Sequence, residues 1–148
     1  QWIPRKRPTI KMKKLPNWES MFHSFVENNN FPFQWGLNDC CKFSNALIKQ
    51  ITGEDLIPKK LKWKDEASAM KAIASYGGDL ETSIEKACNE KGVGEINKAF
   101  MTCGDLVLYA QADSFLVGMC NGFGILTPTD DGINVVANEL AHRVWRFD

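Results

Sequence analysis

Apolar residues recur at helical spacing through the first half of the chain. The clearest stripe has intervals of three, four and four residues and consists of Cys40, Phe43, Leu47 and Ile51. Such spacing places side chains on one face of a helix. Asn38 or Asp39 can cap the start of this helix, and Gly53 stands at the usual stop. The same reasoning predicts helices over residues 18–26, 40–52, 65–76 and 80–89.

The second half of the chain changes to the alternation typical of strands. We expect strands over residues 105–110, 115–120, 124–127, 133–137 and 143–147. Asn121-Gly122 and Asp131-Gly132 are hairpin signals between them. Because the helices come first and the strands after, the pattern predicts an α+β fold, with N-terminal helices packed on a C-terminal antiparallel β-sheet of about five strands.

The composition is that of one globular domain. The chain has 148 residues, of which 44% are hydrophobic and 24% charged, and this balance suits a single core. No apolar run approaches the ~18 residues that cross a bilayer. No stretch resembles a nucleic-acid-binding module. We therefore expect neither a membrane nor a nucleic acid as a partner.

Charge is distributed unevenly although the formal net charge is zero. No acidic residue precedes Glu19, whereas six basic residues do: Arg5, Lys6, Arg7, Lys11, Lys13 and Lys14. We expect residues 1–16 to form a basic arm in front of a single domain over residues 17–148. The arm is expected to contact other proteins or the acidic body of the chain, and a solvated tail is the alternative.

The cysteines and histidines limit the metal and redox chemistry of the chain. The five cysteines are Cys40, Cys41, Cys88, Cys103 and Cys120. Their odd number and the lack of a C-x-x-C spacing indicate neither a disulfide framework nor a zinc site. Only two histidines are present, and phosphate-binding loops are absent. We expect free thiols, no metal and no cofactor.

One segment combines residues suited to chemistry, the run Trp35-Gly36-Leu37-Asn38-Asp39-Cys40. It places a cysteine on the first turn of a helix, directly after a capping acid. Helix N–H groups and the macrodipole stabilise a thiolate there, and a nucleophilic cysteine needs this stabilisation. Buried structural cysteines are also common. On spacing alone, core packing is the favoured interpretation of this cysteine.

The same segment resembles the NlpC/P60 superfamily of papain-like cysteine peptidases. The motifs behind this likeness are Trp35-Gly36, Asp39-Cys40, Phe43 and Gly104-Asp105-Leu106. The chain is closer still to the DUF6950 group of phage and prophage tail-region proteins. The added motifs are Pro32-Phe33, Thr52-Gly53, Val117-Gly118, Gly132 and Trp145-Arg146-Phe147. The resemblance covers residues 18–147 and implies a papain-like fold in which the cysteine opens a helix packed on an antiparallel sheet.

The chain departs from active NlpC/P60 peptidases at the histidine. In those enzymes a catalytic histidine stands just before Val-Gly, and here that position is Leu116. His142 and His23 are the candidate substitute bases. A surface position for His142 and partial burial for His23 are the alternative interpretations.

Three residues near the cysteine are candidates for the groove. Phe33 and Trp35 are expected to line a groove beside Cys40 or to plug it, and the missing histidine favours the plug. Asp39 is expected to cap the helix or to bond the preceding aromatic loop, not to take part in catalysis.

The resemblance implies a structural or assembly component of a tailed-bacteriophage tail, at the tail tip or hub. Such a protein is made in the host cytoplasm, resides in the virion and contacts other tail proteins. The alternative is an active cysteine peptidase or amidase that cleaves peptidoglycan peptides during genome entry, with Cys40 as nucleophile. A histidine within ~3 Å of the Cys40 sulfur, or one water away, would favour the enzyme. Enzymatic activity stays undecided at this point, and the missing histidine favours an inactive fold.

Overall fold

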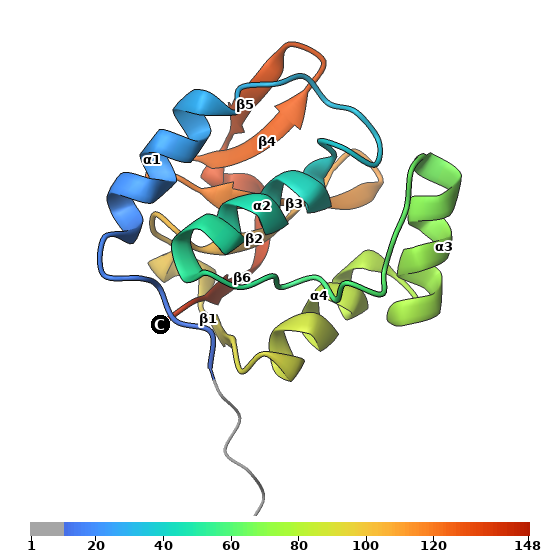
Figure 1. The fold of residues 1–148 in the computed structure, drawn as a ribbon, viewed down its shortest axis with the longest axis horizontal. Coiled ribbons are helices and arrows are strands. Elements are labelled where there is room, and N and C mark those ends of the chain that lie inside the picture. Colours follow the sequence, from blue (N-terminus) through green and yellow to red (C-terminus); the bar gives the residue numbers. More distant parts are fainter. Residues whose placement is uncertain (1–10) are drawn as a thin grey trace, which may run out of the picture.

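The computed structural model describes residues 11–148. Of the expected basic arm, Arg5, Lys6 and Arg7 lie outside the described residues. Figure 1 shows helices gathered on one side of a curved sheet, with α3 and α4 forming a pair at its margin. No helix within residues 11–148 is long and apolar enough to cross a membrane.

Four helices form where the apolar periodicity predicts them. They are α1 (Trp18–Asn28), α2 (Cys40–Thr52), α3 (Glu66–Tyr76) and α4 (Leu80–Glu90). Asp39, Asp65 and Asp79 cap the last three, because each side chain accepts the backbone N–H group three residues ahead. Gly53 ends α2 with a left-handed φ of 82°, a conformation that glycine adopts without steric cost.

The second half of the chain forms one antiparallel sheet. Its strands are β1 (Gly94–Ile96), β2 (Leu106–Gln111), β3 (Ser114–Cys120), β4 (Ile125–Thr129), β5 (Gly132–Val136) and β6 (Ala141–Arg146). Their order in the sheet is β1-β6-β2-β3-β4-β5. The α+β prediction is confirmed, but the expected count of about five strands is corrected to six within residues 11–148. The missed strand, β1, has only three residues, too few for alternation to be visible.

Both hairpin signals mark real turns. Around Asn121 the turn joins β3 to β4, and the Asn121 side chain accepts the backbone N–H groups of Phe123 and Gly124, both at 2.9 Å. The turn between β4 and β5 falls at residues 130–131, since Thr129 pairs with Gly132. These two turns set the register in which β4 pairs with β3 and β5 pairs with β4.

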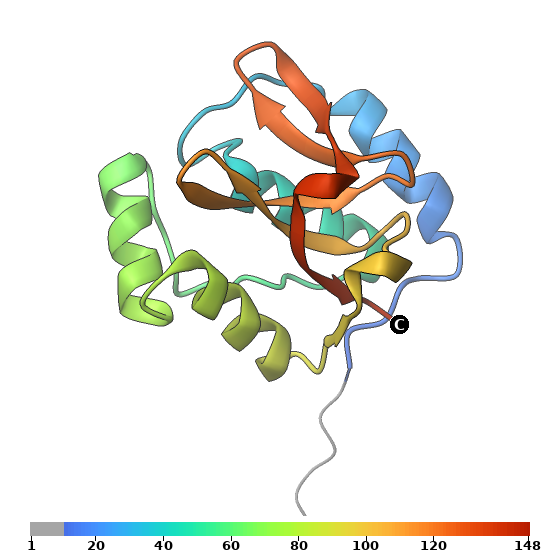
Figure 2. The ribbon, with the colours of Figure 1, turned by 180° about the vertical axis from the view of Figure 1, so that it is seen from behind.

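The two faces of the sheet carry separate apolar clusters. Leu106 and Leu108 of β2 belong to the larger cluster, which also contains the buried residues of α2. Val107 and Tyr109 belong to the smaller one. Successive strand residues point to opposite faces, so the large cluster fills the space under the helices and the small one lies on the side seen in Figure 2.

Residues 11–16, the described part of the expected arm, lie against the domain. The backbone N–H of Lys14 donates to the carbonyl of Asp148 at 2.7 Å, and that of Leu15 donates to Ile51 at 2.8 Å. Met12 is 1% exposed and belongs to the large cluster. The Lys14 ammonium lies 4.5 Å from the Trp18 ring centroid, and burial lowers its pKa. This part of the segment therefore contacts the body of the chain.

Candidate functional site

Asp39 fixes the start of α2 and the residues around it. Asp39 is 1% exposed, and its carboxylate accepts three hydrogen bonds. The donors are Lys42 N at 2.9 Å, Gly36 N at 2.9 Å and Trp63 Nε1 at 2.7 Å. The first caps the helix, and the other two tie the preceding aromatic loop and a later loop to the same carboxylate. Asp39 thus caps the helix, as its position in the sequence predicts.

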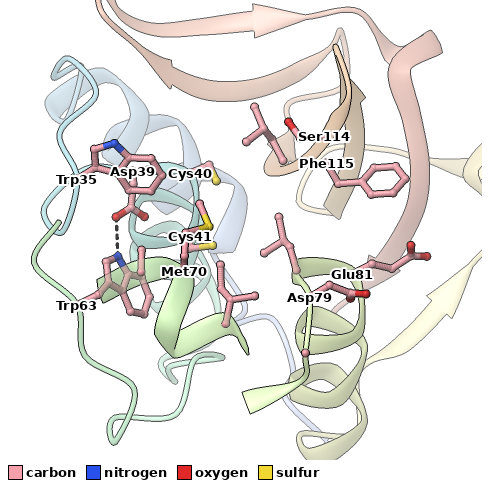
Figure 3. A pocket seen from close by; sticks show the side chains of 15 residues that line it. Trp35, Asp39, Cys40, Cys41, Trp63, Met70, Asp79, Glu81, Ser114 and Phe115 are labelled. Atoms are coloured by element: carbon pink, nitrogen blue, oxygen red, sulfur yellow. Dashed lines mark hydrogen bonds between the residues drawn. The ribbon is translucent and has the colours of Figure 1, made fainter. Parts of the chain in front are cut away.

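A cavity opens beside the start of α2 and is shown in Figure 3. Its volume is about 460 Å³. We call it the cysteine cavity, because Cys40 and Cys41 form part of its wall. The remaining walls come from α3, the first turn of α4 and the start of β3, together with Trp35 and Trp63. The stretches 35–41, 63–73, 78–81 and 114–116 therefore meet at the cavity.

The two thiols differ in their tendency to ionise. The side chain of Cys41 lowers the pKa of Cys40 despite the burial of Cys40, and the backbone of Val117 lowers it further. Cys40 in turn raises the pKa of Cys41 well above its ordinary value. Cys40 is 9% exposed. Of the two thiols, Cys40 therefore ionises first. It lies at the N-terminus of α2, where the helix dipole stabilises a thiolate.

Within residues 11–148, the wall opposite the thiols carries no histidine. Leu116, the residue just before Val117-Gly118, lines the cysteine cavity. Phe115 also lines it, with its ring directed away from the cysteines in Figure 3. A leucine and a phenylalanine cannot accept a proton, so this strand supplies no general base.

His142 packs against the Phe115 ring. The two rings stack with centroids 4.8 Å apart, and His142 Nε2 lies 3.5 Å from Glu81 Oε2. His23 instead lies on α1 with its ring 5.5 Å from that of Phe22. Neither histidine is among the residues that line the cysteine cavity. The structure thus brings neither candidate base into the wall that holds Cys40.

Trp35 and Phe33 meet at right angles, with ring centroids 5.0 Å apart. Trp35 lines the cysteine cavity, whereas Phe33 is not among the lining residues. The backbone N–H of Phe33 donates to Thr129 O at 2.8 Å and anchors the loop to the end of β4. Space remains beside Cys40, so Trp35 is placed as a wall of the cavity.

The sequence did not single out several residues of this site. Trp63 and Met70 add apolar surface to the cavity, and Asp79 and Glu81 add carboxylates. Trp63 reaches it through its hydrogen bond to Asp39, and the other three reach it because the α3–α4 pair stands at the margin of the sheet. Trp63 was the one local signal of this site. It stands between Lys62 and Lys64, so its indole ring needs a packing partner from another part of the chain.

Metal ligation has no support among residues 11–148. Within that part of the chain, no three His, Cys, Asp or Glu side chains come together as a metal site requires. What the cysteine cavity offers is a polarised thiol, apolar walls and hydrogen-bonded carboxylates.

The fold and the site define a class: a single α+β domain in which a cysteine opens a helix and faces a cavity at the edge of an antiparallel sheet. The chain belongs to the DUF6950 family, described as a domain of unknown function, and the match covers residues 13–147. No curated protein matches it.

Proposed function

We propose that this chain is an assembly component of a tailed-bacteriophage tail, built on an NlpC/P60-type papain-like fold whose former peptidase groove now binds without hydrolysing. Two things support the proposal. The chain belongs to the DUF6950 family, and the sequence resembles the phage tail-region members of that group and the wider NlpC/P60 superfamily. The arrangement around Cys40 supports the absence of hydrolysis.

The observation that carries the proposal is the lack, among the described residues, of a free proton acceptor opposite Cys40. Amide cleavage by a thiol needs a group that protonates the leaving amine, and general acid–base assistance is typically worth about 10²–10⁴-fold. Leu116 and Phe115 occupy the facing strand. Each carboxylate of the wall already has a hydrogen-bond or ion-pair partner, because Asp39 and Asp79 cap helices and Glu81 pairs with Arg143 at 3.2 Å. A cavity with this lining can hold a partner, but none of its described residues is placed to transfer a proton to the leaving amine.

An active cysteine hydrolase that cleaves peptidoglycan peptides is the second candidate. It is favoured by the lowered pKa of Cys40 and by the open space beside its thiol. Under this candidate, His142 would have to leave Phe115 and Glu81 and turn toward the cavity.

Replacing Cys40 with serine in the phage or prophage that encodes the chain separates the two candidates. If the cavity only binds, Cys40→Ser phage should form plaques within about threefold of the wild-type number, because serine keeps the shape and hydrogen-bonding capacity of the thiol. The chain should also be found in purified tails by mass spectrometry.

A chain missing from purified tails would contradict the assembly role. Two results together would establish the hydrolase instead. Cys40→Ser phage would have normal tails but infectivity reduced by more than about tenfold, and wild-type protein, but not the Cys40→Ser variant, would release peptides from purified peptidoglycan. Cys103→Ser is the matched control, because Cys103 lies outside the cavity wall.

A further inference from the structure

The charged side chains that line the cysteine cavity all have the same sign. They are Asp39, Asp79 and Glu81, and the lining formed by residues 11–148 contains no lysine, arginine or histidine. Asp39 has three hydrogen-bond donors, none of them a charged group. Asp79 accepts the N–H of Thr82, which lowers the pKa of Asp79 and keeps it ionised at neutral pH. This part of the chain therefore lines the cavity with carboxylates and places no cation on its wall.

Groups that carry or can carry positive charge also act near these carboxylates, and one of them is His142, whose Nε2 lies 3.5 Å from Glu81 Oε2. The N-termini of α2 and α4 meet the cavity, and each is equivalent to about half a positive charge. Arg143, outside the lining, binds Glu81 at 3.2 Å, but it also binds Glu85 at 2.6 Å and Glu95 at 2.7 Å. One guanidinium thus serves three carboxylates. The margin of the cavity next to α4 remains negative.

The rest of the wall is apolar and aromatic. Trp35, Trp63, Met70, Ile73, Leu80 and Leu116 supply most of it. Met70 is 50% exposed, so part of this apolar surface is accessible from solvent. An apolar channel with a negative end suits a ligand that has an alkyl stem and a cationic tip. Contact of this kind already exists in the fold, since the Lys42 ammonium lies 4.3 Å from the Trp63 ring centroid.

We infer that the cysteine cavity is a docking site for a lysine side chain presented by a partner polypeptide. The alkyl stem lies between Trp35, Trp63 and Met70, and the ammonium points to the margin formed by Asp79 and Glu81. This inference rests on the proposed function, because it takes the cavity as a binding site that leaves the partner chain intact. An uncharged apolar side chain would fill the same walls but add no cation at this margin, where Arg143 is shared among three carboxylates.

The experiment titrates a short lysine peptide, acetyl-Ala-Lys-Ala-amide, into ¹⁵N-labelled protein and follows the indole N–H signals of Trp35 and Trp63. The matched ligand replaces lysine by norleucine, which has a similar stem and no ammonium. We expect the lysine peptide to bind at least about tenfold more tightly than the norleucine peptide, and to weaken in high salt.

Two variants test which carboxylate gives the preference for lysine. Glu81→Gln should remove most of the preference for lysine, because Glu81 lines the cavity. Glu85→Gln should keep it, because Glu85 binds the same Arg143 but does not line the cavity. The two substitutions remove equal charge from neighbouring turns of one helix, so a general electrostatic effect would act on both alike.

Equal binding of the two peptides, equal losses in the two variants, or no saturable shift with either peptide would each overturn the inference. The same samples are analysed by mass spectrometry after the titration. Cleavage of the bound lysine peptide would refute the proposed function while leaving the lysine preference in place. Absence of both binding and cleavage would refute the lysine inference and leave the proposed function untouched.

Discussion

Replacing Leu116 with histidine is expected to raise the alkylation rate of Cys40 at pH 6 by about 100-fold. Leu116 lines the cavity that holds Cys40, and the adjacent residue, Val117, already touches the thiol through its backbone. An imidazole there would form a thiolate–imidazolium pair, and such pairs bring cysteine pKa values far below ~8.5. The measurement is the iodoacetamide rate at Cys40, resolved from the other thiols by peptide mass spectrometry.

Phe115→His is the matched control for this substitution. It introduces the same imidazole one residue earlier, on a side chain that points away from the cysteines in Figure 3. It should change the Cys40 rate by less than about threefold, because the Phe115 ring is stacked on His142 and directed away from the cysteines. If Leu116→His had no greater effect than Phe115→His, Leu116 would not be the residue of this strand that faces the thiol.

Replacing Arg146 with alanine is expected to lower the free energy of unfolding by about 3 kcal/mol, because it leaves a buried carboxylate without its cation. Asp105 has no exposed side-chain surface. It accepts from Arg146 Nε at 3.0 Å, from Arg146 Nη2 at 2.9 Å and from Thr102 N at 2.9 Å. This pair ties the entry of β2 to β6, the strand beside it. Urea denaturation followed by tryptophan fluorescence measures the change.

The exposed pair of Lys11 and Asp148 provides the comparison. Its atoms are 3.9 Å apart, and both side chains are more than half exposed, so Lys11→Ala should cost less than about 1 kcal/mol. Adding Asp105→Asn to Arg146→Ala should recover part of the loss, since it removes the uncompensated charge. An Arg146→Ala variant as stable as Lys11→Ala would show that the buried pair does not hold these strands together.

The helices were predictable because their signals are local. The stripe from Cys40 to Ile51 and the capping aspartates act within a few residues of each other, so the boundaries of α2 agree with the expectation. β1 was not predictable in the same way. Gly94–Ile96 is a strand only because β6 pairs with it, some fifty positions later in the sequence, and its own residues carry no strand pattern.

The same difference between local and distant signals decides which residues of the site were predictable. Trp35, Asp39 and Cys40 were identified together because they are contiguous and lie at a helix start. Trp63 reaches the cavity through its hydrogen bond to Asp39, and Glu81 reaches it through the placement of α4. No spacing in the sequence predicts either contact. The interpretation of Trp35 as a plug arose because sequence alone gives no measure of the space left beside Cys40.

The measurement that tests the central claim most directly is the pH dependence of Cys40 alkylation in wild-type protein and in a His142→Asn variant. The pKa of Cys40 is lowered, so its thiolate persists to lower pH, and the midpoint should lie below the ~8.5 of a free thiol. The two profiles should superimpose, because His142 is held by Phe115 and Glu81 and does not line the cavity. Slower labelling of Cys40 at neutral pH in His142→Asn would mean that the imidazole acts on the thiol, and the site would then be a peptidase dyad.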